Sequence, residues 1–265
     1  MNPVQLAAGA GLAAFIAFIA YAGGTLSRSG AAAAFLVGAL TFGFGGLLPA
    51  MLLIAFFVSS SLLSRFGSRR KQALAEKFAK GSTRDAAQVA ANGSAAAVMA
   101  VLLGLRGDGI WLVALLGALA AATADTWATE LGVLARSQPR LVTDGRPVEP
   151  GTSGAVTIEG TVAAGAGSLF LGGLAAVYQA APSLALAGLL GGLGGAFVDS
   201  LLGASVQARY LCQSCGRPTE HSPRHTCGAA TDFAGGWRWL TNDAVNAAAS
   251  LAGAALAILV FRLFG

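Results

Sequence analysis

The chain has 265 residues, of which 55% are hydrophobic and only 11% are charged, and its mean hydropathy is +0.67. Soluble domains carry about 25% charged residues, so this composition excludes an ordinary soluble domain and predicts an all-α fold, a polytopic helical transmembrane bundle. The formal net charge of +5 comes from basic residues that cluster between apolar runs. That distribution is typical of membrane-protein loops rather than of a nucleic-acid-binding surface.

Eight apolar runs approach or reach the length of about 20 residues with which a helix crosses the bilayer core. The first run has no basic residues before it, so we interpret it as a retained span rather than a cleaved signal peptide. The second and third runs are separated only by "TFGFGGLLPA", in which Gly46 and Pro49 favour a break. Without that break, residues 31–64 would form one helix and the bundle would have seven spans. The predicted spans are 4–22, 31–46, 47–64, 85–104, 110–134, 160–181, 184–206 and 243–264.

The distribution of positive charge predicts the orientation of the bundle. With eight spans and both termini outside, all of the 17 basic residues except Arg106 and Arg262 fall in cytoplasmic loops, as the positive-inside rule requires. We therefore expect residues 1–265 to form a single integral domain of the plasma (inner) membrane. The segment "SRRKQALAEKFAKGSTRD" (68–85) alternates basic and apolar residues, so it lies either on the inner membrane surface or in a solvated loop.

Two of the predicted spans resemble each other. "LLGALAAATAD" (115–125) and "LLGGLGGAFVD" (189–199) match at six positions with a constant offset of 74 residues. Leu, Gly and Ala match easily by chance, so the aligned Asp125 and Asp199 carry the hypothesis of a repeat. Both spans run from outside to inside in the predicted topology, which would make the repeat parallel.

Polar side chains gather toward the cytoplasmic ends of the spans. Because ionisable residues inside a membrane helix cost about 2.5–3.5 kcal/mol at its centre, they indicate a functional site by default. Spacings of three and four residues place the members of each group on shared or adjacent helix faces. The groups are Arg84, Gln88 and Asn92; Asp125, Thr126, Thr129 and Glu130; Asp199 and Gln207; and Asn242, Asp243 and Asn246.

The three acids Asp125, Glu130 and Asp199 predict a magnesium site, since Mg²⁺ takes one or two carboxylates together with water and substrate phosphates. Arg84 could bind a phosphate through two parallel hydrogen bonds. In the loop "EPGTSGAVTIEG" (149–160), Thr152 and Ser153 lie between glycines before a helix start, which fits either a phosphate-binding loop or an ordinary turn. The alternatives for all these polar groups are helix caps with interhelical hydrogen bonds, and an ion or proton relay in a transporter.

The loop 207–241, inserted between the last two spans, contains every Cys and His residue of the chain. The spacing of Cys212, Cys215, His225 and Cys227 predicts a structural, zinc-knuckle-like site with four ligands, and His221 is the competing fourth ligand. Glycines follow the second and third cysteines, as tight knuckle turns require. Disulfides are disfavoured in the cytoplasm, so the alternatives to zinc are reduced thiols or a redox-labile pair.

Several motifs together resemble one known family. "ADTWATELG", "GTSGAV", "DSLLGA" with the later Gln207, "QVAANG", the CxxC…CG loop and "NDAVN" are similar to the integral membrane family catalogued as domain of unknown function ninety-two. That family includes transmembrane protein nineteen of animals and the plant phytyl-phosphate kinase of vitamin E synthesis. The resemblance runs from about residue 5 to the C-terminus.

The resemblance implies a CTP- and magnesium-dependent kinase that converts an isoprenyl monophosphate to its diphosphate. Asp125, Glu130 and Asp199 would then be the catalytic residues that hold the metal and the nucleotide phosphates. Gln88, Asn92, Thr126, Asn242, Asp243 and Asn246 would line the site. The expected partners are the bilayer, an isoprenyl phosphate and a nucleoside triphosphate, and a homodimer stays open. A cytidylyltransferase making a CDP-lipid and a membrane transporter are the competing functions.

Overall fold

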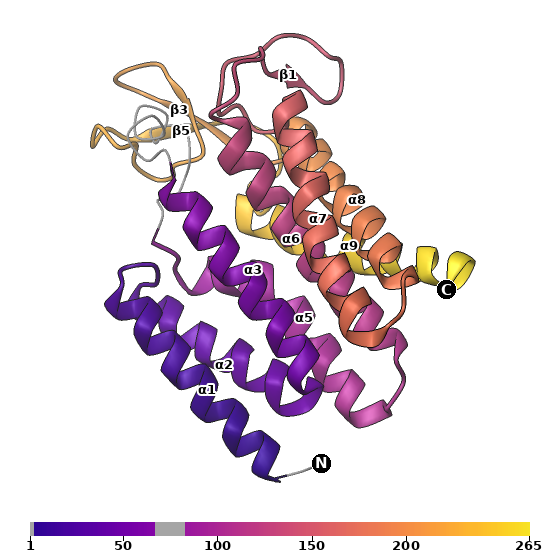
Figure 1. Ribbon diagram of the computed structural model, residues 1–265. Coiled ribbons are helices and arrows are strands. Elements are labelled where there is room, and N and C mark those ends of the chain that lie inside the picture. Colours follow the sequence, from indigo (N-terminus) through magenta and orange to yellow (C-terminus); the bar gives the residue numbers. More distant parts are fainter. Residues whose placement is uncertain (1–2, 67–82) are drawn as a thin grey trace.

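Eight apolar helices of 18 to 23 residues dominate the computed structural model, which describes residues 3–66 and 83–265 (Figure 1). Each is long and apolar enough to cross a bilayer, so the predicted all-α membrane bundle is confirmed. Residues 68–82, which make up most of the basic segment 68–85, lie outside the described residues. The helices are α1 (Pro3–Ala22), α2 (Arg28–Gly45), α3 (Leu47–Arg65), α5 (Ala86–Arg106), α6 (Ile110–Gly132), α7 (Ile158–Gln179), α8 (Ser183–Ser205) and α9 (Asn242–Phe264).

The break between the second and third spans occurs at Gly46. This residue has a φ of 81°, a left-handed conformation that glycine adopts without steric cost. Its N–H donates to the carbonyl oxygen of Phe42 at 2.8 Å and so caps α2, and α3 begins at the next residue. Pro49 lies in the first turn of α3, where its missing N–H costs no intrahelical hydrogen bond. The version with eight spans is therefore confirmed, and the version with seven spans is wrong.

Helix α6 lies at the centre of the bundle. It packs against α3, α5, α7, α8 and α9, and it is buried without interruption from Val113 to Ala124. Small and aliphatic side chains fill this stretch, which suits close helix packing in lipid. The polar residues of the predicted site begin directly after it, at Asp125.

The two matched segments of the sequence occupy equivalent positions against α9. A Cβ atom at Gly117 of α6 would lie 2.4 Å from the carbonyl oxygen of Gly253, and a Cβ at Gly191 of α8 would lie 2.8 Å from the same oxygen. These residues are 74 positions apart, as are Asp125 and Asp199. The glycines let the three backbones approach closely, and both helices then continue in parallel to their aspartates.

One end of the bundle carries all the short strands, and we call it the polar end. Here α3, α6 and α8 end and α5, α7 and α9 begin (Figure 1). After α6, β1 (Arg140–Leu141) pairs with β2 (Ala155–Val156). After α8, β3 (Arg209–Cys212), β4 (Pro218–Thr219) and β5 (Thr231–Gly235) form an antiparallel sheet in the order β4-β3-β5. The sequence did not predict these strands, which are small additions to the helical fold.

Candidate functional site

A cavity of about 850 Å³ lies at the polar end, enclosed by the helices and by the loops that carry the strands. Every residue predicted from the sequence to bind magnesium, nucleotide or substrate lines it. The tertiary structure thus brings together groups that come from four separate helices and three connecting segments. These lining residues are Arg84, Gln88, Asn92, Asp125, Thr126, Thr129, Glu130, Thr152, Ser153, Asp199, Gln207, Asn242, Asp243 and Asn246.

Asp125 of α6 and Asp199 of α8 converge in this cavity. Their carboxyl groups lie within hydrogen-bonding reach of each other. Two carboxylates this close repel each other unless a proton or a cation lies between them. The Oδ2 atom of Asp199 is buried and has no hydrogen-bond partner among the described residues. A close carboxylate pair with one free buried oxygen fits the ligand requirements of Mg²⁺, which completes its shell with water and phosphate oxygens.

Glu130 lies in the same cavity but in different surroundings. Its Oε1 accepts a hydrogen bond from the Ser64 hydroxyl of α3, and its charge interacts with Arg84. In the described parts of the chain, no three carboxylates lie close enough together to hold a single ion. The geometry therefore separates the predicted three-acid set into a carboxylate pair, Asp125 with Asp199, and an acid–arginine group.

Arg84 is held firmly just before α5. Its backbone N–H donates to the carbonyl oxygen of Thr25 at 2.9 Å, and its carbonyl oxygen accepts from Ser27 at 3.0 Å. The guanidinium lies 5.9 Å from the ring centre of Phe56 and 5.7 Å from that of Phe57. Burial lowers the pKa of Arg84, and the Glu130 carboxylate partly offsets this. A desolvated guanidinium of this kind gains strongly from an anionic ligand.

Gln88 and Asn92 follow Arg84 along α5, and both have structural hydrogen bonds. Gln88 forms a capping box with Asp85, in which each side chain accepts from the other residue's backbone N–H at 2.9 and 3.2 Å. Asn92 Nδ2 donates to the Gln88 carbonyl oxygen at 3.0 Å. The helix-cap alternative therefore holds for Gln88, although its side chain also lines the cavity.

The loop with Thr152 and Ser153 packs directly on α8. Gly154 has a φ of 75°, and a Cβ there would lie 2.5 Å from the carbonyl oxygen of Ser200, so only glycine fits. Both hydroxyls are engaged within the protein: Thr152 Oγ1 donates to the Glu149 carbonyl oxygen at 2.7 Å, and Ser153 Oγ donates to Glu220. The loop therefore forms an ordered wall of the cavity beside Asp199.

Glu220 is a cavity residue that the sequence analysis did not select. It comes from the Cys/His loop, accepts hydrogen bonds from Ser153 and from Gln207 Nε2 at 2.7 Å, and interacts electrostatically with Asp199. Gln207 is only 2% exposed, so this contact joins the Cys/His loop to the core of the site. No spacing pattern marks Glu220, and its position directly before His221 was the only available signal.

The beginnings of α5, α7 and α9 border the cavity. Thr157 caps α7 by accepting from the Gly160 N–H at 3.0 Å, and Thr241 caps α9. The start of a helix carries partial positive charge and is a common binding position for phosphate. The cavity thus combines a carboxylate pair suited to a cation with helix ends and an arginine suited to phosphates.

The predicted zinc ligands Cys212, Cys215, His225 and Cys227 also come together, next to the cavity. Their ligand atoms all lie within 4.8 Å of one another, and His225 Nδ1 lies 3.2 Å from Cys227 Sγ. Backbone hydrogen bonds from Cys215 and Ser214, opposed by burial, lower the pKa of the Cys212 thiol to about 6. Three sulfur atoms and one imidazole at this spacing fit a closed tetrahedral zinc site.

The two glycines that follow the cysteines have the geometry expected of knuckle turns, since Gly216 and Gly228 have φ values of 65° and 87°. His221 lies outside the four-ligand set. It lines the large cavity, and its ring centre is 6.2 Å from that of His225. The geometry thus favours His225 over His221 as the fourth ligand.

Comparison with known proteins agrees with this architecture. The model of a family described as "Integral membrane protein DUF92" matches residues 11–254. Protein PGR of Arabidopsis thaliana is 34% identical over 228 residues, which cover 76% of this chain and 78% of that protein. An uncharacterized membrane protein of Methanocaldococcus jannaschii is 33% identical over 70% of this chain and 76% of its own length. The chloroplastic protein VTE6 of Arabidopsis thaliana is 27% identical over 89% of this chain and 65% of its own length. No solved structure matches the chain.

Proposed function

Because the chain belongs to the DUF92 family of integral membrane proteins, we propose that it is a CTP- and Mg²⁺-dependent kinase that phosphorylates an isoprenyl monophosphate. The product would be the corresponding diphosphate, and a phytyl-type chain is the first candidate. The motifs resemble those of the family that includes plant phytyl-phosphate kinase, and the chloroplastic VTE6 is among the relatives. Family membership alone does not define a reaction, so the proposal depends on the site.

The observation that carries the proposal is the convergence of Asp125 and Asp199 in a cavity bordered by the starts of α5, α7 and α9. Phosphoryl transfer needs positioned phosphates and compensation of their charge, and little else from the protein. The carboxylate pair would hold Mg²⁺, which would supply compensation for the negative charge that develops on the nucleotide phosphates. Asn242 and Asn246, near the start of α9, also line the cavity and would contact the nucleotide.

The chain's own residues then have separate tasks. Arg84 and Asn92 orient the acceptor phosphate, whose oxygen attacks the γ-phosphorus of CTP. The new P–O bond forms as the bond to the β–γ bridging oxygen breaks, and CDP leaves. The acceptor phosphate is already ionised at neutral pH, so no strong general base is required. This agrees with the absence of His from the predicted spans.

We place the polar end in the cytoplasm, where CTP is available. Among the described residues, the basic side chains at the opposite end are Arg106 and Arg262, and the others lie at or near the polar end. The positive-inside rule then puts the polar end inside and both termini outside. None of the buried residues Val113–Ala124 of α6 lines the cavity, which counts against a transport path along this helix.

The test is a reconstituted reaction. The protein in lipid nanodiscs is incubated with CTP, MgCl₂ and phytyl or geranylgeranyl phosphate, and products are identified by mass spectrometry. We expect prenyl diphosphate and CDP, loss of turnover in Asp125→Asn, and normal turnover in the matched control Asp144→Asn, whose side chain is 52% exposed in a loop. No turnover with any nucleotide across a panel of prenyl phosphates would overturn the proposal. Release of pyrophosphate with a CDP-lipid would instead identify a cytidylyltransferase, and nucleotide-independent flux in liposomes would identify a transporter.

A further inference from the structure

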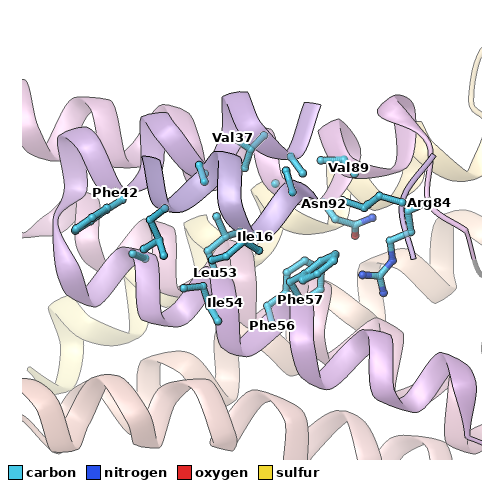
Figure 2. A pocket seen from close by; sticks show the side chains of 18 of the residues that line it. Ile16, Val37, Phe42, Leu53, Ile54, Phe56, Phe57, Arg84, Val89 and Asn92 are labelled. Atoms are coloured by element: carbon cyan, nitrogen blue, oxygen red, sulfur yellow. The ribbon is translucent and has the colours of Figure 1, made fainter. Parts of the chain in front are cut away.

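A second, apolar cavity lies among α1, α2, α3 and α5, and we call it the apolar groove (Figure 2). It measures about 110 Å³, which is less than the volume of one turn of a helix of about 10 Å diameter. Figure 2 shows its apolar side chains extending from Phe42 past Leu53 and Ile54 to Phe57, with Asn92 and Arg84 at one end. The groove therefore has an apolar body and a single polar end.

The apolar groove adjoins the cavity that contains Asp125 and Asp199, which we call the acidic cavity. Four residues line both of them: Arg84, Gln88, Asn92 and Thr126. Thr126 directly follows Asp125, so the polar end of the groove lies beside the carboxylate pair. Any molecule that fills both spaces must have an aliphatic part in the groove and an anionic part at Arg84.

The helices that form the groove are closely packed, and one of its lining residues is exposed. A Cβ at Gly9 of α1 would lie 2.9 Å from the N atom of Gly43, and a Cβ at Gly93 of α5 would lie 2.9 Å from a methyl of Val37. Helices α1, α2 and α5 are thus closely packed through small residues. Leu12 of α1 lines the groove and is 36% exposed, on a helix long and apolar enough to cross a bilayer. We therefore place the lateral entrance of the groove at Leu12.

We propose that the apolar groove receives the isoprenyl chain of the acceptor lipid, while the lipid's phosphate binds at Arg84 and Asn92. The inference rests on the proposed function for the identity of the lipid. Its physical basis is the junction of the two cavities, because Arg84 is the cation at the end of an otherwise apolar channel. The lipid enters sideways from the bilayer, and the nucleotide enters the acidic cavity from the aqueous phase.

We expect the groove to fix the position of the bound lipid more than to increase the lipid's affinity. A chain that moves from lipid into the groove exchanges one apolar environment for another, so it gains little hydrophobic free energy. Packing in the groove instead fixes where the headgroup lies, which is the contribution that phosphoryl transfer needs. The experiment should therefore report where the chain binds as well as how strongly.

Photolabelling in nanodiscs provides this readout without CTP. The probe is a geranylgeranyl phosphate with a diazirine on its terminal isoprene unit, and labelled peptides are mapped by mass spectrometry. We expect labels on groove residues such as Ile16, Val37 and Leu53. Ala34→Phe, which fills the groove, should reduce this labelling about tenfold. Ala32→Phe, on the exposed face of the same helix, should not.

A second variant and a second probe guard against misfolding and non-specific insertion. Leu53→Ala enlarges the groove and should keep the label at the groove. The phosphate-free diazirine alcohol should label the groove much less, because it has no charge for Arg84. Labels spread over the lipid-facing helices, or equal labelling by the alcohol, would overturn the inference even in a protein with full kinase activity. Groove labelling in a protein without turnover would support the lipid site and count against the kinase.

Discussion

Replacing Gly253 with alanine places a methyl group at the point where α6, α8 and α9 meet. The added Cβ would lie 2.6 Å from the Cβ of Ala121, 2.7 Å from the carbonyl oxygen of Gly117 and 3.1 Å from that of Gly191. Two of these three neighbours are backbone atoms, so no side-chain rotation can relieve the contact. The helices themselves must move apart.

The expected cost follows from that geometry. Overpacking of a close-packed interior costs about 1–3 kcal/mol, and the better helix propensity of alanine returns at most about 1 kcal/mol. We therefore expect Gly253→Ala to lower the free energy of unfolding by about 1–2 kcal/mol. The displacement of the helices should also reduce turnover, because Asp125 and Asp199 lie about two turns after Gly117 and Gly191 on the same helices.

The assay is thermal unfolding of the detergent-purified protein, followed by size-exclusion chromatography of a fluorescent fusion. Gly173→Ala is the matched control, since a Cβ at Gly173 of α7 meets no atom within 4 Å. Adding Ala121→Gly to Gly253→Ala removes one of the three contacts and should restore part of the lost stability. If Gly253→Ala unfolds at the same temperature as the wild type and the control, the close packing of these three helices is refuted.

Three further outcomes are expected. Asp199→Asn should lower turnover at least about 100-fold. The double variant Asp125→Asn/Asp199→Asn should be no slower than Asp199→Asn, because the two carboxylates act as a unit. If the losses of the two single variants multiply in the nanodisc assay, the shared site is contradicted. Protein purified without chelator should contain about one zinc per chain by elemental analysis. The Cys227→Ser variant should lose this zinc, and the His221→Ala variant should keep it. Zinc well below one per chain in the wild type, or loss of zinc from His221→Ala, would reject the ligand set. Glu220→Ala removes the acceptor of two cavity hydrogen bonds, one of them from a buried glutamine. The loss should lower the free energy of unfolding by about 1–3 kcal/mol. An unchanged unfolding temperature would show that these two hydrogen bonds do not stabilise the fold.

The positions of the spans were predictable because hydrophobic length is a local property of the chain. The break at Gly46 was predictable for the same reason, since glycine and proline mark interruptions without help from tertiary contacts. The zinc ligands were also predictable, because their spacing within one short loop reflects the geometry of the site. The choice of His225 over His221 required the fold of the β3–β5 sheet.

The acidic site was predictable as a list of residues but not as an arrangement. The 74-residue offset suggested that Asp125 and Asp199 are related, and their contact depends on how α6 and α8 both pack against Gly253. The separation of Glu130 from the pair depends on Ser64, a residue 66 positions away on α3. Glu220 has no sequence signal comparable to that of the aspartates, because it reaches the cavity only through the fold of the Cys/His loop.

The sequence by itself predicted the apolar runs that are long enough to cross a membrane, the polar side chains at the ends of the helices, and a Cys/His loop with the spacing of a zinc site. These properties depend on hydrophobic periodicity, charge and short spacings, which are local. Only the tertiary structure decided that the carboxylates meet, that Glu220 joins them and that an apolar groove leads to Arg84. Those features arise from contacts between helices far apart in the chain, where close backbone approach rather than local pattern sets the distances.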